Sequence, residues 1–291
     1  MTTNTPPPWA LNPHPRAADL LARVRSLAEV SDRAVIIAMC NQKGGVGKTT
    51  HTINLAGALA EAGLRVLVDD CDPQANATSG FLVERPNPAG FTQRTAVLEA
   101  RDAHPLVVPT KVPNIHLLPA SIDMALMPSG LRDTGIGLTL YRRMLEPFMG
   151  EYDVILLDMR PALDTDTDAQ IAASDVSIIN VDVDKWSMEG VGYQLAQQKK
   201  ALNLVDRLDE HEVIGMIIGR VTKPMGAFDK EVYEALCSHP RLPVLGEIPI
   251  RSADLKEARH EGLPVVQFRP KCDTAQFFRD ITVRSGLVKA A

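Results

Sequence analysis

A glycine-rich loop between an apolar stretch and a helical pattern carries the clearest chemistry of the chain. The loop reads Lys43-Gly44-Gly45-Val46-Gly47-Lys48-Thr49-Thr50 and follows the apolar run 34–40. Glycines let successive backbone N–H groups turn toward an anion, and the start of the following helix adds the positive end of its dipole. In such a loop Lys48 would reach the β- and γ-phosphates of a nucleotide, and the Thr49 hydroxyl would bind Mg²⁺. The loop therefore predicts a nucleotide-phosphate site.

The loop departs from the ordinary pattern G-x-x-x-x-G-K-[ST] in two places. Gln42 stands where that pattern has its first glycine, and Lys43 adds a second lysine. In this form the loop resembles the deviant Walker A motif of the ParA/MinD family of ATPases. The resemblance implies that residues 43–50 bind ATP and that Lys43 crosses a dimer interface to the partner subunit's nucleotide. The alternative, a glycine-rich turn with two surface lysines, is disfavoured by the aligned strand, loop and helix signals.

Carboxylates end two further apolar runs. Asp158 ends the run 152–158, and the carboxyl edge of a parallel sheet would place it to bind Mg²⁺ directly or through water. Asp70 and Asp72 lie at the end of the run 65–70, where a carboxylate can orient a water in line with the γ-phosphate. The alternatives are a helix cap or turn for Asp158 and a solvated turn for the pair.

The segment 70–80 makes the resemblance specific. Its sequence, DCDPQANATSG, is similar to the D-x-D-P-Q-x-N-A-T-S-G segment of ParA partition ATPases, and the similarity spans about residues 34–285. The resemblance implies that Asp72 orients the attacking water and that Asp70 lies near the Mg²⁺ shell. The expected catalytic residues are thus Lys43, Lys48 and Asp72, and the expected metal ligands are Thr49, Asp70 and Asp158.

Three residues near these motifs depart from the family pattern. Arg160 follows Asp158 where the family usually has proline, so it either adjusts the switch that senses the γ-phosphate or pairs with a nearby carboxylate. Asp69 takes a usually apolar strand position, where a buried carboxylate needs a partner. His51 replaces a usual threonine and is expected to be a structural residue that faces outward from the helix start. The carboxylates available to Arg160 are Asp164, Asp166 and Asp168.

Strand patterns alternate with helix patterns along most of the chain. This alternation predicts an α/β P-loop NTPase fold, a mostly parallel twisted sheet with helices on both faces. Strands are expected at 34–40, 65–70, 114–119, 152–158, 176–181, 213–218 and 244–249, and helices at 49–62, 138–148, 187–202, 253–261 and 274–283. Residues 34–291 are expected to form one ATPase domain, preceded by a disordered Pro-rich lead at 1–16 and an amphipathic helix at 17–33. That helix either packs on its own domain or contacts a partner.

Composition limits the kind of protein this is. The 291 residues are 45% hydrophobic, which suits a soluble globular chain with a substantial core. Aromatic residues make up only 4%, too few for stacking on single-stranded nucleic acid to be the main activity. The four cysteines include no C-x-x-C pair, which argues against a zinc site or disulfide framework and fits the cytosol. No apolar run approaches the roughly 18 residues that a membrane-spanning helix needs.

The partners follow from the resemblance. It implies an ATP-bound homodimer that binds nonspecific double-stranded DNA, with weak hydrolysis that a ParB-type centromere-binding protein stimulates, in a cytoplasmic, nucleoid-associated protein without membrane binding. Residues 251–291 hold eight basic side chains against five acidic ones, in a chain of net charge −5. Such a local surplus is compatible with phosphate contacts, although a solvated surface is the alternative. The eight are Arg251, Lys256, Arg259, Arg269, Lys271, Arg279, Arg284 and Lys289.

Two other functions remain open. The first is a MinD-like regulator that docks on a membrane through a C-terminal amphipathic helix. Apolar character for such a helix comes from Phe277, Phe278, Ile281 and Val283, and Asp280 interrupts it. The second is a metabolic P-loop ligase or synthetase, which would have a deep substrate pocket. The segment 70–80 argues against the synthetase.

Overall fold

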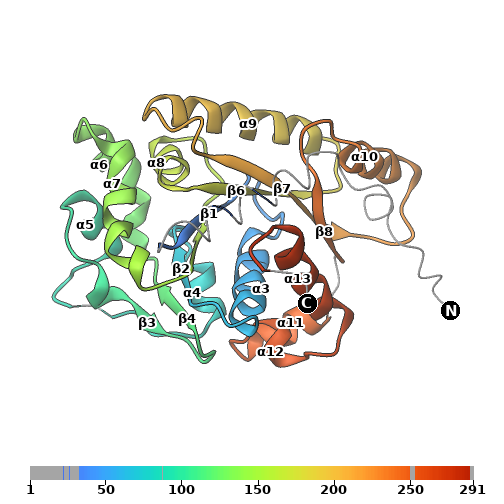
Figure 1. The fold of residues 1–291 in the computed structure, drawn as a ribbon, viewed down its shortest axis with the longest axis horizontal. Helices are drawn as coiled ribbons and strands as arrows, with labels where there is room; N and C mark the ends of the chain where they lie inside the picture. Colours follow the sequence, from blue (N-terminus) through green and yellow to red (C-terminus); the bar gives the residue numbers. More distant parts are fainter. Residues whose placement is uncertain (1–21, 23–25, 27–32, 87, 250–252, 289–291) are drawn as a thin grey trace.

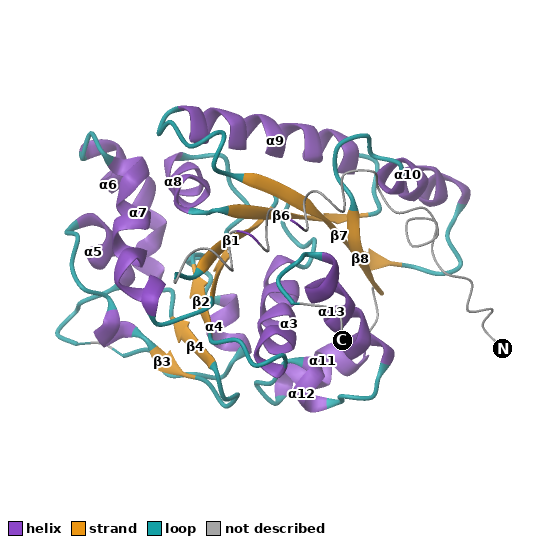
Figure 2. Cartoon of the chain, in the orientation of Figure 1, coloured by secondary structure: helices purple, strands orange, loops and turns teal. Residues whose placement is uncertain are grey.

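A single sheet runs through the molecule, and helices cover both of its faces (Figures 1 and 2). The computed structural model describes residues 22, 26, 33–86, 88–249 and 253–288. Within these residues eight strands pair in the order β3-β4-β2-β5-β1-β6-β7-β8. All neighbours are parallel except β3 and β4. The predicted fold class, a mostly parallel sheet between helical layers, is confirmed.

The central strands are buried on both faces. All six residues of β1 are buried, because β1 lies between β5 and β6 with helices above and below. The strands are β1 (Val35–Cys40), β2 (Val66–Asp70), β3 (Val108–Pro109), β4 (Ile115–Leu118), β5 (Val154–Asp158), β6 (Val176–Asp182), β7 (Glu212–Val221) and β8 (Val244–Pro249). Each of the seven predicted strands is present within about three residues of its expected bounds.

Alternate residues of β1 enter two different hydrophobic clusters. Ile36 and Ala38 face the cluster that helices α5 to α10 complete, whereas Ile37 and Met39 face the cluster completed by α3, α4 and α11 to α13. The first layer comprises α5 (Gln93–Leu98), α6 (Met127–Asp133), α7 (Gly137–Leu145), α8 (Thr165–Ala173), α9 (Ser187–Asn203) and α10 (Ala227–Cys237). The second comprises α3 (Lys48–Glu61), α4 (Asn76–Gly80), α11 (Ala253–His260), α12 (Val265–Phe268) and α13 (Asp273–Arg284). Three 3-10 turns lie at His104–Leu106, Ile122–Leu126 and Glu146–Gly150.

Helix α8 shows why some elements were absent from the sequence prediction. Eight of its nine residues are buried, including Asp166 and Gln170, so no polar stripe alternates with an apolar one. Its start is fixed instead by a capping box, in which the Asp164 side chain accepts from the N–H groups of Asp166 and Thr167. The short elements β3, α4, α5, α6 and α12, and the helix α10, were likewise not predicted.

Two sequence predictions concern the N-terminal region. The Pro-rich lead at 1–16 lies outside the described residues, as does the helix at 17–33 apart from residues 22, 26 and 33.

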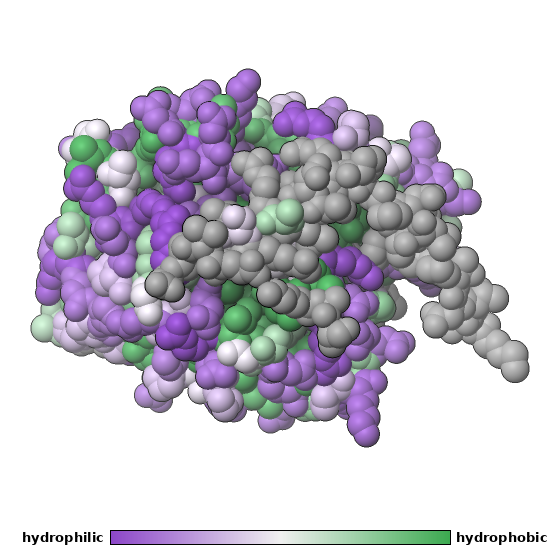
Figure 3. Space-filling view, viewed as in Figure 1, coloured by the Kyte–Doolittle hydropathy of each residue, from purple (hydrophilic) through white to green (hydrophobic). Residues whose placement is uncertain are grey.

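In the part of the chain that the structure describes, no helix has both the length and the apolar character to cross a bilayer. Figure 3 shows a largely hydrophilic face with a small apolar region near α3 and α4.

Asp69 is the carboxylate that the strand pattern placed in an apolar position, and it is fully buried in β2. Its Oδ1 accepts a hydrogen bond from Nε2 of Gln93 in α5, so the partner it needs comes from a helix that was not predicted. Its Oδ2 has no partner among the described residues. Burial, together with the charge of neighbouring Asp70, raises the pKa of Asp69 from 3.8 to about 8.

Asp69→Asn should change how stability depends on pH. Because the pKa of Asp69 is higher in the folded than in the unfolded chain, its contribution is complete below about pH 4 and is lost as pH rises toward 8. Between pH 5.5 and 7.5 the unfolding free energy of the variant should gain about 2–3 kcal/mol on that of the original chain, measured by urea denaturation. A gap that stays constant over this range would show that Asp69 has its ordinary pKa. The exposed Asp133→Asn is the matched control and should show no such drift.

Candidate nucleotide site

The glycine loop joins the carboxyl end of β1 to the start of α3, as its sequence predicted. Gly45 and Gly47 adopt φ values of 78° and 98°, a left-handed conformation that side chains other than glycine rarely adopt. At Gly47 a Cβ atom would also lie 2.9 Å from Nε2 of His51. Both the backbone conformation and the lack of space for a Cβ atom therefore require glycine at position 47.

Lys48 is the buried cation of the loop. Its side chain bends back so that Nζ donates to the backbone oxygen of Lys43 at 3.2 Å. Burial lowers the pKa of Lys48, and the nearby carboxylates of Asp158 and Asp72 act in the opposite direction. The structure thus brings the lysine that was predicted to bind phosphate and two of the predicted acidic residues close enough to interact electrostatically.

Asp158 lies at the end of β5, in register with Asp70 of β2 on one side and with Met39 of β1 on the other. Its Oδ1 accepts from Thr52 Oγ1 at 3.0 Å, and the nearby Thr49 side chain acts to lower its pKa. Its Oδ2 has no partner among the described residues. Burial and the charge of Asp70 raise the pKa of Asp158 to about 7. A cation beside Oδ2 would relieve both the missing partner and the buried charge.

These oxygens suit Mg²⁺ bound together with a nucleotide. Magnesium usually takes one or two protein oxygens and completes its shell with water and phosphate. Thr49 and Asp158 offer a hydroxyl and an unpartnered carboxylate oxygen. Among the described residues no three His, Cys, Asp or Glu side chains form a metal-binding group, so a cage made of protein alone is not seen there.

Asp70 is already engaged by the protein. Its Oδ2 accepts from both the N–H and the hydroxyl of Thr78 at 2.7 Å, and its Oδ1 accepts from Asp72 N–H at 3.3 Å. Burial raises the pKa of Asp70 to about 6, against the effect of these hydrogen bonds. The geometry makes Asp70 the anchor of α4 and of the turn that follows β2.

Asp72 occupies that turn and is partly exposed. Its Oδ1 accepts from Gln74 N–H at 2.9 Å, which fixes the carboxylate at the edge of the sheet. Ala75, three residues later, has a left-handed φ of 54° and begins α4. Asp72 therefore has an accessible carboxylate within electrostatic reach of Lys48.

Lys43 does not extend away from its own chain in this structure. Its Nζ lies 2.8 Å from Asp182 Oδ2 and also contacts Asp184. Partial burial acts to lower the pKa of Lys43, but the hydrogen bonds to these two carboxylates raise it overall. Sequence reasoning missed both acids. Asp182 is the last residue of β6, just as Asp158 is the last residue of β5. This position at the carboxyl end of a strand could have identified Asp182 from the sequence.

His51 was expected to face outward, and this expectation is wrong. Its side chain is buried beneath the glycine loop, where Nδ1 lies 2.7 Å from Asn180 Oδ1 of β6. Burial lowers the pKa of His51 to about 4, so the imidazole is neutral at pH 7. The neutral imidazole fits below Gly47, whereas a protonated one would place a second positive charge close to Lys48.

Arg160 pairs with its neighbouring acids. Its Nε lies 3.2 Å from Asp166 Oδ2, and its Nη2 contacts Asp164, the residue that caps α8. Of the alternatives set by the sequence, pairing with a nearby carboxylate is confirmed. Asp168 instead binds Gln197 and Lys200 of α9.

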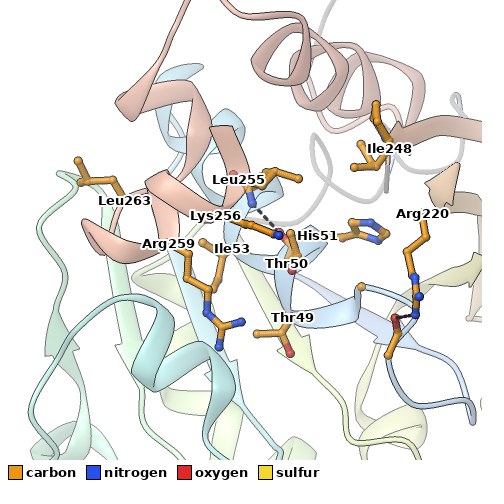
Figure 4. Close-up of a pocket in the computed structure, with 14 residues that line it drawn as sticks. Thr49, Thr50, His51, Ile53, Arg220, Ile248, Leu255, Lys256, Arg259 and Leu263 are labelled. Atoms are coloured by element: carbon orange, nitrogen blue, oxygen red, sulfur yellow. Dashed lines mark hydrogen bonds between the residues drawn. The ribbon is translucent and has the colours of Figure 1, made fainter. Parts of the chain in front are cut away.

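A cavity of about 360 Å³ opens beside the loop, between α3, the end of β7 and α11 (Figure 4). Arg220 lies on one side of it and donates to the backbone oxygen of Gly45 at 3.2 Å. Lys256 and Arg259 of α11 line it near Thr49 and Thr50. Its size and its position next to the phosphate loop suit the remainder of a nucleotide.

The C-terminal basic residues are used differently from one another. Lys256 and Arg259 line the cavity, whereas Arg251 and Lys289 lie outside the described residues. Three others form ion pairs: Arg269 with Asp254 and Glu257, Arg279 with Glu61, and Arg284 with Asp280. Among the described residues, three of the basic side chains counted from the sequence are therefore already paired with acids, while Lys271 is exposed.

The C-terminal apolar residues are also accounted for. Phe278 and Ile281 are fully buried in the cluster between α13, α3 and β8, and Phe277 packs against that cluster. These side chains do not form an exposed apolar face on α13.

Known proteins resemble this chain over most of its length. A family described as an AAA domain matches residues 34–208. The sporulation initiation inhibitor protein Soj of Bacillus subtilis is 32% identical over 254 residues, covering 84% of this chain and 96% of Soj. The chromosome partitioning protein ParA of Myxococcus xanthus is 34% identical over 225 residues, covering 74% of this chain and 78% of ParA.

A solved structure with a similar fold comes from a different enzyme class. Cobyrinic acid a,c-diamide synthase of Mycobacterium smegmatis, with a bound ATP analogue and magnesium, superposes with a TM-score of 0.68 at 26% identity, covering 79% of this chain and 93% of the synthase. A similar fold thus also occurs in a synthase, so the fold alone does not distinguish the two kinds of protein. The sequence relatives reported above are Soj and ParA. The chain belongs to the ParA/MinD family of P-loop ATPases, among its Soj-like members.

Proposed function

We propose that this chain is an ATP-dependent partition protein that alternates between a monomer and an ATP-bound sandwich dimer. The observation that carries the proposal is the arrangement around the loop: Lys48, Asp158 and Asp72 converge on one edge of the sheet, with Lys43 at its rim. The relatives named Soj and ParA support a role in partition. In this proposal the dimer binds nonspecific DNA, and a ParB-type partner stimulates hydrolysis.

Each residue has a distinct task in hydrolysis. Lys48 binds the β- and γ-phosphates, while the loop N–H groups hold their oxygens. Thr49 and Asp158 would hold Mg²⁺, which neutralises phosphate charge when it is bound. Asp72 accepts a hydrogen bond from the attacking water and aligns it with the γ-phosphate.

Lys43 supplies the link between nucleotide and dimer. Its side chain is 39% exposed. The ion pair with Asp184, itself 35% exposed, contributes only about 0–1 kcal/mol, whereas the Asp182 side chain is only 10% exposed. A partner's triphosphate would therefore displace Asp184 readily and must compete with Asp182 for Lys43. ATP then binds the dimer more tightly than the monomer, and this difference shifts the population toward the dimer.

Lys48→Ala should abolish ATP binding, because the phosphates lose their buried cation. Charged hydrogen bonds contribute about 1.5–3 kcal/mol each, so the dissociation constant for Mg-ATP should rise by about a hundredfold or more. Isothermal titration calorimetry measures this directly. The exposed Lys230→Ala is the matched control and should bind ATP as the original chain does. Unchanged affinity in Lys48→Ala would remove the assigned role of the loop.

Asp72→Ala should separate binding from turnover. The variant should bind ATP normally and accumulate as a dimer in light scattering, while phosphate release falls by about 10²-fold or more. Asp133→Ala, at an exposed aspartate at the end of α6, is the matched control and should hydrolyse ATP at the original rate. An Asp72→Ala chain that stays monomeric with ATP would contradict the dimer switch, and undiminished turnover would contradict the role of Asp72.

A further inference from the structure

A smaller cavity, of about 250 Å³, lies at the amino edge of the sheet, on the opposite side from the glycine loop. Its lining comes from α7, the end of α8 and the segments that lead into β1, β5 and β7. It shares no lining residue with the cavity beside the loop. The loop follows the carboxyl end of β1, so the length of that strand, roughly 20 Å, separates the two sites. One nucleotide bound at the loop would not fill both.

Arginine dominates the polar part of the wall. Two consecutive arginines come from α7, one precedes β1 and one follows α9. The four are Arg33, Arg142, Arg143 and Arg207, and Glu146 is the single acid among the described lining residues. Three segments far apart in sequence therefore bring positive charge to one concave site, which concentrates anions from solution.

Asp175, directly before β6, is the internal counter-ion of this cluster. Its side chain is only 4% exposed, and its Oδ1 accepts from Arg207 Nη2 at 3.0 Å and from Arg142 Nη1 at 3.1 Å. Arg33 Nη2 lies 3.5 Å from the same oxygen. The other oxygen, Oδ2, accepts from the N–H of Ile36 in β1 at 3.0 Å. One carboxylate oxygen thus serves three guanidinium groups.

The acids do not balance the arginines. Asp175 and Glu146 offset two of the four positive charges of the wall. Glu210 also pairs with Arg207, at 2.8 Å, but its side chain is 64% exposed, so solvent screens its charge. Burial lowers the pKa of Arg142, and the charge of Arg207 acts in the same direction, against that of Asp175. An anion in the cavity would relieve this crowding of positive charge.

Two of the arginines retain donors for such an anion. Arg142 uses Nη1 for Asp175 and for the backbone oxygen of Ala173. No residue that the structure describes accepts from its Nε or Nη2, and neither atom is fully buried. Arg143 is exposed and forms no ion pair within the described part of the chain. Guanidinium groups bind the oxygens of phosphate through pairs of N–H bonds, and these donors are free to do so.

We propose that this cavity binds a free phosphate-type anion with at least two negative charges, of the size of pyrophosphate, through Arg142 and Arg143. The two charges match the two that the acids of the wall leave uncompensated. A volume of about 250 Å³ is below that of most sites for drug-sized ligands and suits a compact anion. The site is distinct from the glycine loop, where the nucleotide is proposed to bind.

Pyrophosphate tests the site on the full chain. Titration followed by amide resonances separates the two phosphate sites, because 138–146 and 205–207 report on this cavity and 44–50 report on the glycine loop. Saturable shifts are expected at 138–146 and 205–207. Acetate, which carries one charge, should bind there about tenfold more weakly or less tightly still.

Arg143→Gln removes one charge of the wall without breaking an ion pair, and it replaces one good helix former by another. The dissociation constant for pyrophosphate, read from 138–146 and 205–207, should rise by about tenfold or more. Arg132→Gln, at an exposed arginine of α6 outside the cavity, is the matched control and should bind pyrophosphate as the original chain does.

Three results would overturn the proposal: pyrophosphate shifts confined to 44–50, equal affinity of Arg143→Gln and the original chain, or acetate binding as tight as that of pyrophosphate. An unrelated DNA duplex identifies the source of the phosphate. Pyrophosphate that stays bound when duplex is added supports a site for a free anion, whereas its displacement would assign the arginines to a nucleic-acid backbone and overturn the proposal. Because no readout needs ATP, failure here leaves the proposed function untouched.

Discussion

The pairing of β5 with β1 on one side and β2 on the other is the constraint on which the rest of this molecule depends. Each of these strands is a short, mainly apolar run that is buried on both faces. β2 and β5 end in the carboxylates of Asp70 and Asp158, and β1 leads directly into the glycine loop. The parallel registers Met39↔Asp158 and Asp70↔Asp158 place those ends at one edge of the sheet. A shift of β5 by one residue would turn Asp158 to the other face and separate it from Thr49 and Thr52.

Charge is concentrated at this edge, and the protein balances it within one chain. Burial raises the pKa of Asp70 and Asp158, while Lys48 is the buried cation among them. The unpartnered oxygen of Asp158 marks where positive charge is still needed. Lys43, at the rim, is held by two acids of its own chain, the buried Asp182 and the half-buried Asp184. This arrangement explains how one loop can serve both a nucleotide and a second subunit, as proposed above.

The sequence predicted the elements whose local pattern matches their environment. The apolar strands, the glycine loop and helix α3 could be located because hydrophobic period, glycine position and flanking residues agree. Helix α8 could not, since it is buried nearly all round and its polar residues Gln170 and Thr167 contact partners about 30 residues away, Tyr141 and Gln197. The position of His51 depends on Asn180, a contact across 129 residues that no local pattern contains.

The same limit applies to the departures from the family pattern. Asp69 and Arg160 are conspicuous in the sequence, but their partners, Gln93 and the acids at the start of α8, come from segments with weak patterns. Between the predicted strands at 65–70 and 114–119 the sequence has little recognisable periodicity, and α5, which supplies Gln93, lies in this segment. Tertiary contacts, rather than propensity, decide the structure of such segments.

The central claim is that ATP controls the association of this chain with DNA. It is tested most directly by measuring the binding of an unrelated duplex by fluorescence anisotropy without nucleotide and with ADP, ATP or a slowly hydrolysed ATP analogue, each at low and moderate salt. The account predicts binding only with ATP and its analogue, weakening as salt rises because the contacts are to phosphates. Binding that is the same in all four nucleotide states, or absent from all of them, would contradict it.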